Sequence, residues 1–118
     1  MAEKTSEIPD SMAEIVKKAW GIELVHCNEP EYCGKTLVIR DGGKSSLHFH
    51  RVKKETFYVK SGVVRLELDG QEEFLYPGDA RTIAPGIPHR FSSVRGAEIL
   101  EFSTHHDDAD VVRLEPSA

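Results

Sequence analysis

Turn-forming residues recur at short intervals after Gly21 and leave only short segments between them. Asp41-Gly42-Gly43, Asp69-Gly70 and Pro85-Gly86 each favour a reversal of the chain. The segments between the turns have the apolar patterns typical of β-strands. We expect strands over Ile22–His26, Tyr32–Arg40, Ser46–His50, Thr56–Lys60, Val63–Leu68, Glu73–Tyr76, Ala80–Ile83, His89–Ser93, Glu98–Ser103 and Val111–Leu114. This pattern predicts an all-β sandwich or barrel, with Asp69-Gly70 as the strongest hairpin signal.

The first twenty residues have a different pattern. Ser11 and Glu14 have the spacing of a capping box at the start of a helix. The apolar residues of this segment would share one helical face: Met12, Ile15, Val16 and Ala19. We therefore expect a polar arm over residues 1–9 and a short helix that ends near Trp20.

Length, charge and composition limit the possible partners. At 118 residues the chain has room for one core, so we expect an arm and helix over residues 1–19 and a barrel domain over residues 20–118. The net charge of −5, with no basic stripe, argues against a nucleic-acid partner. No apolar run approaches the roughly 20 residues of a membrane span, and the polar start lacks a signal-peptide core. Cys27 and Cys33 lack a CxxC spacing, so we expect reduced thiols and a cytoplasmic protein.

Two histidines and a carboxylate carry the chemical signal. His48 and His50 are two residues apart, so on a strand both imidazoles point to the same face. Glu55 follows at the start of the next predicted strand, where its carboxylate would return beside them. Two imidazoles and a carboxylate directed at one point predict a metal site that needs one more ligand. A Pro-Gly turn and the rigid Ile87-Pro88 step deliver His89 to the start of a later strand.

Glycines flank these residues at characteristic distances. In residue type and spacing, one part of the chain resembles the first cupin motif through Gly42, His48-x-His50, Glu55 and Gly62. A later part resembles the second cupin motif through Gly78, Ala84-Pro85-Gly86 and His89. The resemblance implies a double-stranded β-helix (jelly-roll barrel) with one divalent metal held by His48, His50, Glu55 and His89. Three neutral imidazoles and one carboxylate suit Zn, Mn, Fe, Co, Ni or Cu and leave positions open for water or substrate.

The other three histidines lack this context. His26 is in an early predicted strand, and His105-His106 follow the last long one. We interpret all three as non-ligands, with His105-His106 as a candidate for the rim of the site.

The flanks of the barrel resemble the cupin domain of type II phosphomannose isomerases. Trp20-Gly21-Ile22-Glu23 is similar to the start of that domain, and Val111-Val112-Arg113-Leu114-Glu115 is similar to its end. The resemblance implies aldose–ketose isomerisation of a small sugar, sugar phosphate or sugar derivative, with a general base that is not a metal ligand. Glu101, on a late strand, is the candidate base. Two alternatives stay open, because the fold hosts many functions: an Fe(II)-dependent dioxygenase for a small molecule, and a non-catalytic sugar-binding protein.

Residues around Glu55 lead to two further expectations. Lys53 and Lys54 lie in the loop at the barrel mouth, where exposed lysines could bind a substrate anion. Alternation along the next strand predicts Phe57 inside and Tyr58 outside. Because strands such as Thr56–Lys60 carry apolar residues on both faces, we expect a homodimer that covers the outer face.

Overall fold

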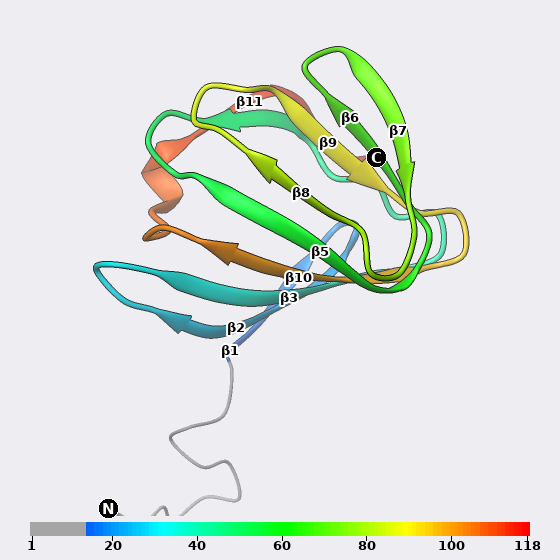
Figure 1. The fold of residues 1–118 in the computed structure, drawn as a ribbon, viewed down its shortest axis with the longest axis horizontal. Coiled ribbons are helices and arrows are strands. Elements are labelled where there is room, and N and C mark those ends of the chain that lie inside the picture. Colours follow the sequence, from blue (N-terminus) through cyan, green and yellow to red (C-terminus); the bar gives the residue numbers. More distant parts are fainter. Residues whose placement is uncertain (1–13) are drawn as a thin grey trace, which may run out of the picture.

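The described part of the chain folds into two antiparallel β-sheets (Figure 1). The structure, a computed structural model, describes residues 14–118. Its elements are β1 (Glu14–Lys18), β2 (Gly21–Asn28), β3 (Cys33–Ile39), β4 (Leu47–His50), β5 (Glu55–Gly62), β6 (Val64–Leu68), β7 (Gln71–Leu75), β8 (Ala80–Ile83), β9 (His89–Ser92), β10 (Ala97–Ser103), the 3-10 helix η1 (Asp108–Asp110) and β11 (Val111–Glu115). The strands expected after Gly21 are β2 to β11, and all their bounds agree within two residues. The all-β prediction is confirmed.

The sheets are built from interleaved strands. The six-stranded sheet has the order β1-β2-β3-β10-β5-β8, and the five-stranded sheet has the order β11-β4-β9-β6-β7. Strand β10 therefore lies between β3 and β5, and β4 lies between β11 and β9, although these segments are far apart in sequence. In Figure 1 the two sheets face each other around a common interior. This is the jelly-roll arrangement.

Alternation along the strands sends one set of side chains into that interior. Phe57 is buried and Tyr58 is 39% exposed, as predicted. Trp20 meets Phe91 edge to face, with ring centroids 4.9 Å apart. Each fully buried side chain of this size contributes about 1.5–3 kcal/mol through the hydrophobic effect. The ring of Phe57 lies 6.1 Å from that of His89, so the apolar core borders the histidines directly.

The predicted N-terminal helix is wrong for the residues that the structure describes. Glu14–Lys18 form the edge strand β1, which pairs antiparallel with β2. Strand β2 offers an edge of unpaired N–H and C=O groups, and pairing with it satisfies the backbone of the segment. The β-branched Ile15 and Val16 also favour a strand, so the tertiary partner outweighed the helical spacing. Ser11 and the expected arm over residues 1–9 lie outside the described residues.

Two turns that require glycine shape the chain. Gly21 has φ +151°, and a Cβ there would clash with the backbone carbonyl of Val38, so only glycine fits where β1 turns into β2. Asp69 and Gly70 have φ values of +53° and +82°, as a type I′ hairpin requires, and join β6 to β7 as predicted. Among residues 14–118, no helix has the length and apolar character needed to cross a membrane.

Candidate metal centre and catalytic pocket

Both sheets contribute to the predicted metal site. His48 and His50 lie on β4, and His89 begins β9 directly opposite His48 in the five-stranded sheet. Glu55 begins β5 in the facing sheet. The jelly roll therefore brings together side chains from three strands that are separated by loops and turns.

Three imidazoles form a compact cluster. The ring centroids of His48 and His89 are 4.5 Å apart, and those of His48 and His50 are 5.2 Å apart. One potential ligand atom from each of His48, His50 and His89 lies within 4.8 Å of the others. This spacing fits coordination of one metal ion by three histidines.

Backbone carbonyls orient two of these rings. Nδ1 of His48 lies 2.9 Å from the carbonyl oxygen of Ser46, and Nδ1 of His89 lies 2.9 Å from that of Ile87. A carbonyl only accepts, so each Nδ1 carries the proton and each Nε2 keeps its lone pair for the interior. Metal-ligating histidines are held in this way by a partner on the other ring nitrogen. The rigid Ile87-Pro88 step thus supplies both the position and the tautomer of His89.

The Glu55 carboxylate lies against the histidines. Its Oε2 is 2.9 Å from Nε2 of His89 and 3.3 Å from Nε2 of His50, and the side chain is 2% exposed. Despite these distances, neither Glu55 Oε2 nor His89 Nε2 makes an aligned hydrogen bond within residues 14–118. Buried polar atoms without partners are costly. A cation between them would satisfy both atoms, so the donor set fits a divalent metal.

The protonation states favour a cation as well. Burial, followed by the neighbouring His89, lowers the pKa of His48 to about 3, so its imidazole is neutral at neutral pH. Burial alone would raise the pKa of Glu55, but the nearby His50 imidazole and the Lys53 ammonium hold it well below its usual range. A neutral imidazole beside an ionised carboxylate is the form in which both residues bind metals.

A second carboxylate lies beside the cluster. Glu101 on β10 is directly opposite Phe57 on β5 and is 4% exposed, so its side chain is inside the sandwich. Its Oε2 lies 2.6 Å from Nζ of Lys53. Burial and the nearby Glu55 raise the pKa of Glu101, while the ammonium groups of Lys53 and Lys35 oppose that increase. Glu101 is thus a buried carboxylate outside the histidine cluster.

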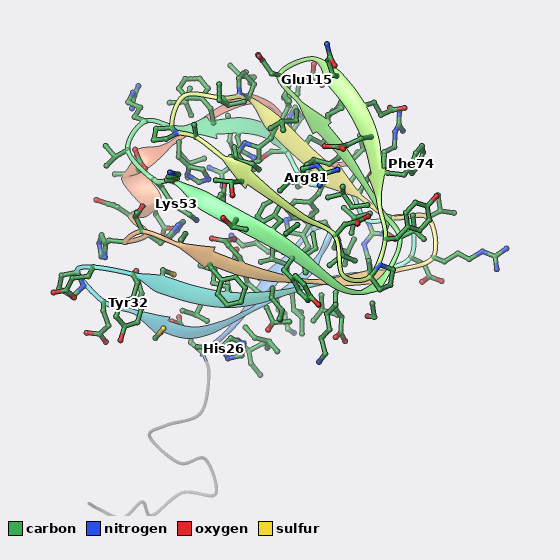
Figure 2. All side chains as sticks on the ribbon, viewed as in Figure 1. His26, Tyr32, Lys53, Phe74, Arg81 and Glu115 are labelled. Carbon is green, nitrogen blue, oxygen red and sulfur yellow. The ribbon has the colours of Figure 1, made fainter. Side chains whose placement is uncertain are left out.

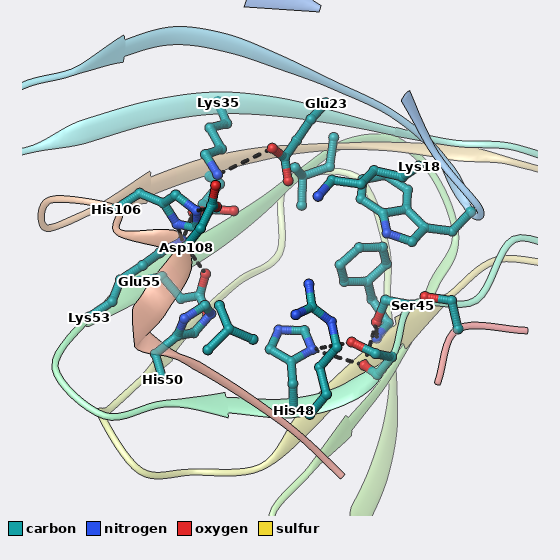
Figure 3. Close-up of a pocket in the computed structure, with 18 of the residues that line it drawn as sticks. Lys18, Glu23, Lys35, Ser45, His48, His50, Lys53, Glu55, His106 and Asp108 are labelled. Carbon is teal, nitrogen blue, oxygen red and sulfur yellow. Dashed lines mark hydrogen bonds and ion pairs between the residues drawn. The ribbon is translucent and has the colours of Figure 1, made fainter. Parts of the chain in front are cut away.

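Lys53 is not the exposed loop residue that we expected. It is 3% exposed, and its Nζ also lies 3.6 Å from Oε1 of Glu55, whereas Lys54 is exposed. Figure 3 shows Lys53 next to Glu55, His50 and His106. The sequence contained no local signal for this, because the carboxylate that pairs with Lys53 comes from a strand 48 residues further along the chain.

His106 belongs to the pocket rather than only to its rim. Its Nδ1 lies 3.1 Å from Nζ of Lys53, and its Nε2 lies 2.8 Å from Oδ1 of Asp108. His105 is exposed and contacts the carbonyl of Glu29 instead. His26 lies on the outside of the six-stranded sheet (Figure 2), where its Nε2 contacts the hydroxyl of Thr36. The interpretation of these histidines as non-ligands stays a prediction.

The cluster opens into a cavity of about 110 Å³. Its polar lining includes the side chains of His48, His50, Lys53, Glu55, Glu101, His106 and Arg113. Its apolar lining includes Trp20, Leu37, Phe57 and Phe91. Arg113 on β11 is directly opposite His48 on β4, so both side chains extend to the same face of the sheet. A cavity of this size can hold several waters or a small polar ligand.

Comparisons with known proteins agree with this architecture. A family model described as "Cupin domain" matches residues 36–105. A protein from Thermosediminibacter oceani named D-lyxose/D-mannose isomerase is 31% identical in an alignment that covers 79% of this chain and 67% of that protein. An RmlC-like cupin from Shewanella frigidimarina superimposes with a TM-score of 0.76 at 17% identity, covering 91% of this chain and 96% of the other. KdgF from Halomonas sp. gives a TM-score of 0.69 at 19% identity, covering 75% of this chain and 81% of the other.

Proposed function

This chain belongs to the cupin family, and from that premise we propose that it is a metal-dependent aldose–ketose isomerase for a small sugar or sugar derivative. The proposed ligands of one divalent transition metal are His48, His50, Glu55 and His89, and the proposed general base is Glu101. The observation that carries the proposal is that His48 and His50 of the histidine cluster line one cavity together with Glu101, a buried carboxylate outside the cluster. The likeness to a protein named D-lyxose/D-mannose isomerase supports a carbohydrate substrate.

The donor set supports one divalent ion. Buried imidazole and carboxylate atoms converge there without hydrogen-bond partners, and a divalent ion would satisfy them. When bound, the ion would act as a Lewis acid that polarises substrate oxygens and stabilises negative charge developing on them.

Isomerisation between aldose and ketose also needs a base that moves a proton from C2 to C1 or the reverse. Glu101 has the required properties, because it is not part of the histidine cluster and lies in the same cavity. Its raised pKa makes the carboxylate a stronger proton acceptor than an exposed glutamate. In this mechanism one Glu101 oxygen takes the proton from one carbon and returns it to the neighbouring carbon.

Metal content and isotope exchange test the proposal. Protein purified without added metal should contain about one divalent transition ion per chain by mass spectrometry. With D-lyxose, D-mannose and related aldoses, deuterium at C2 should move to C1 or exchange into solvent. Oxygen uptake with a small organic substrate, without exchange or interconversion of any sugar, would replace this proposal with the dioxygenase alternative. Sugar binding without either reaction would support the binding protein.

A further inference from the structure

Lys53 is a buried cation with no assigned role in the proposed reaction. We propose that Lys53 is a second catalytic residue of this site, whose ammonium donates a hydrogen bond to the substrate oxygen that becomes negatively charged, and that Asp110 positions it. The identity of the reaction in this inference rests on the proposed function. The role of the side chain rests on the contacts of Lys53.

The hydrogen-bond donors of Lys53 show where a substrate oxygen would lie. An ammonium has three N–H donors. Glu101 Oε2 forms an ion pair with Nζ at 2.6 Å but without the alignment of a hydrogen bond, and His106 Nδ1 lies 3.1 Å from Nζ as an acceptor. Oε1 of Glu55, at 3.6 Å, is beyond hydrogen-bond distance. An N–H donor of Lys53 is therefore available on the side of the proposed metal ligand, where a substrate oxygen would lie.

The neighbours of Lys53 hold it in this orientation. Lysine only donates, so Nδ1 of His106 must accept, and its Nε2–H then donates to Asp108 at 2.8 Å. Asp108 thereby selects the tautomer of His106 that can accept from Lys53. Together with the Glu101 ion pair, this arrangement leaves the ammonium little freedom to turn away from the cavity.

The backbone of the loop is held by Asp110. Oδ1 of Asp110 accepts hydrogen bonds from the N–H groups of Arg51 and Val52, each at 2.9 Å, and Oδ2 accepts from that of Lys53 at 3.0 Å. The hydroxyl of Thr104 accepts from the N–H of Lys54 at 3.0 Å. With both ends of the loop held, Lys53 faces the cavity and Lys54 faces solvent. Lys54 is consequently a matched control of the same residue type.

Affinity for two probes separates a catalytic role from a structural one. D-Erythronohydroxamate is an anionic mimic of the enediolate, and erythritol is a neutral polyol of the same chain length. Lys53→Gln should weaken binding of the hydroxamate by roughly tenfold to a hundredfold, the scale of a lost charged hydrogen bond, and leave erythritol binding nearly unchanged. Lys54→Gln should change neither affinity. Equal losses for both probes, or no loss for the hydroxamate, would overturn the proposal.

A crystal structure of the wild-type protein with the hydroxamate gives a readout that no variant can compromise. The expected result is Lys53 Nζ within hydrogen-bond distance of a hydroxamate oxygen, and a separation greater than about 4 Å would overturn the role. This result stands apart from the proposed reaction. If the protein bound the hydroxamate through Lys53 but isomerised no sugar, the reaction would be wrong and the Lys53 contact correct.

Asp110 is tested through the kinetic constants. Asp110→Ala should lower kcat by roughly tenfold, at unchanged metal content, because a mobile Lys53 would stabilise the transition state poorly. Asp110→Asn retains one acceptor oxygen and should recover part of that loss. If both variants lowered only the melting temperature and left kcat unchanged, Asp110 would not position Lys53.

Discussion

The two sheets supply two different walls of the cavity. The five-stranded sheet contributes His48, His50 and His89, and two of these rings are oriented by backbone carbonyls only two residues away. The facing wall contributes Glu55 and Glu101, which both lie beside Lys53, and Glu101 comes 48 residues after Lys53 in the chain. The first wall is thus organised locally, whereas the second depends on an ion pair between residues far apart in sequence. Substitutions far from the cavity should therefore disturb the side-chain positions of the first wall less than those of the second.

The largest expected effect comes from breaking the histidine wall itself. His89→Ala removes one of four proposed ligands, so metal content should fall to a small fraction of the wild-type value and activity should be lost with it. The melting temperature should also fall, because bound metal stabilises only the folded state. His26→Ala, on the outside of the six-stranded sheet, is the control and should keep its metal. Equal metal content in both variants would refute the assignment of His89.

On the facing wall, Glu101→Gln should separate catalysis from metal binding. Loss of a general base typically lowers turnover by about a hundredfold or more, and metal content should be unchanged because Glu101 lies outside the cluster. The wild-type rate should fall with decreasing pH above the usual range for a glutamate, because burial and Glu55 raise the pKa of Glu101 and the base must be ionised. The residual rate of the variant should lack this limb. Loss of metal in Glu101→Gln would contradict the separation of the two walls.

A smaller effect, on stability, is expected at low pH. Burial alone would raise the pKa of Asp110, but the N–H groups of the Lys53 loop lower it below its usual value of 3.8. A carboxylate with a lowered pKa stabilises the fold above its unfolded pKa, and this contribution is lost as pH falls through the folded value.

Urea unfolding of the wild type and Asp110→Asn under the same metal conditions measures this contribution. The difference in stability between them should be constant near neutral pH and shrink below about pH 4. A difference that stayed constant down to pH 2.5 would show that the Asp110 charge does not contribute.

The smallest effect concerns the hydroxyl beside His48. Ser46 Oγ lies 2.9 Å from Nδ1 of His48, but the Ser46 carbonyl lies at the same distance and is kept in Ser46→Ala. Metal affinity should therefore fall by less than the roughly tenfold to hundredfold loss typical of a removed partner of a metal ligand. A competition titration with a chelator measures it. A larger loss would show that the side chain, rather than the local backbone, orients the ring.

The parts of the fold and site that were predicted correctly depend on local geometry. Alternation placed Phe57 inside and Tyr58 outside, Asp69-Gly70 formed the expected hairpin, and the spacing of His48 and His50 put both rings on one face. Each inference needs only the period of a strand or the backbone preference of a turn residue. The homodimer, the cytoplasmic location, Glu55 as a ligand and Glu101 as the base stay predictions.

Tertiary structure decided the features that depend on a distant partner. Glu14–Lys18 became a strand because the edge of β2 was available to pair with it, whatever its helical spacing. Lys53 entered the cavity because Glu101 and Asp110, which come 48 and 57 residues later in the chain, bind its ammonium and its backbone. The amino-acid sequence by itself therefore determined the strands after Gly21, their turns and the histidine pair, since these follow from neighbouring residues. The charged wall was determined only on folding, because a buried ion needs a partner and only the complete fold supplies one.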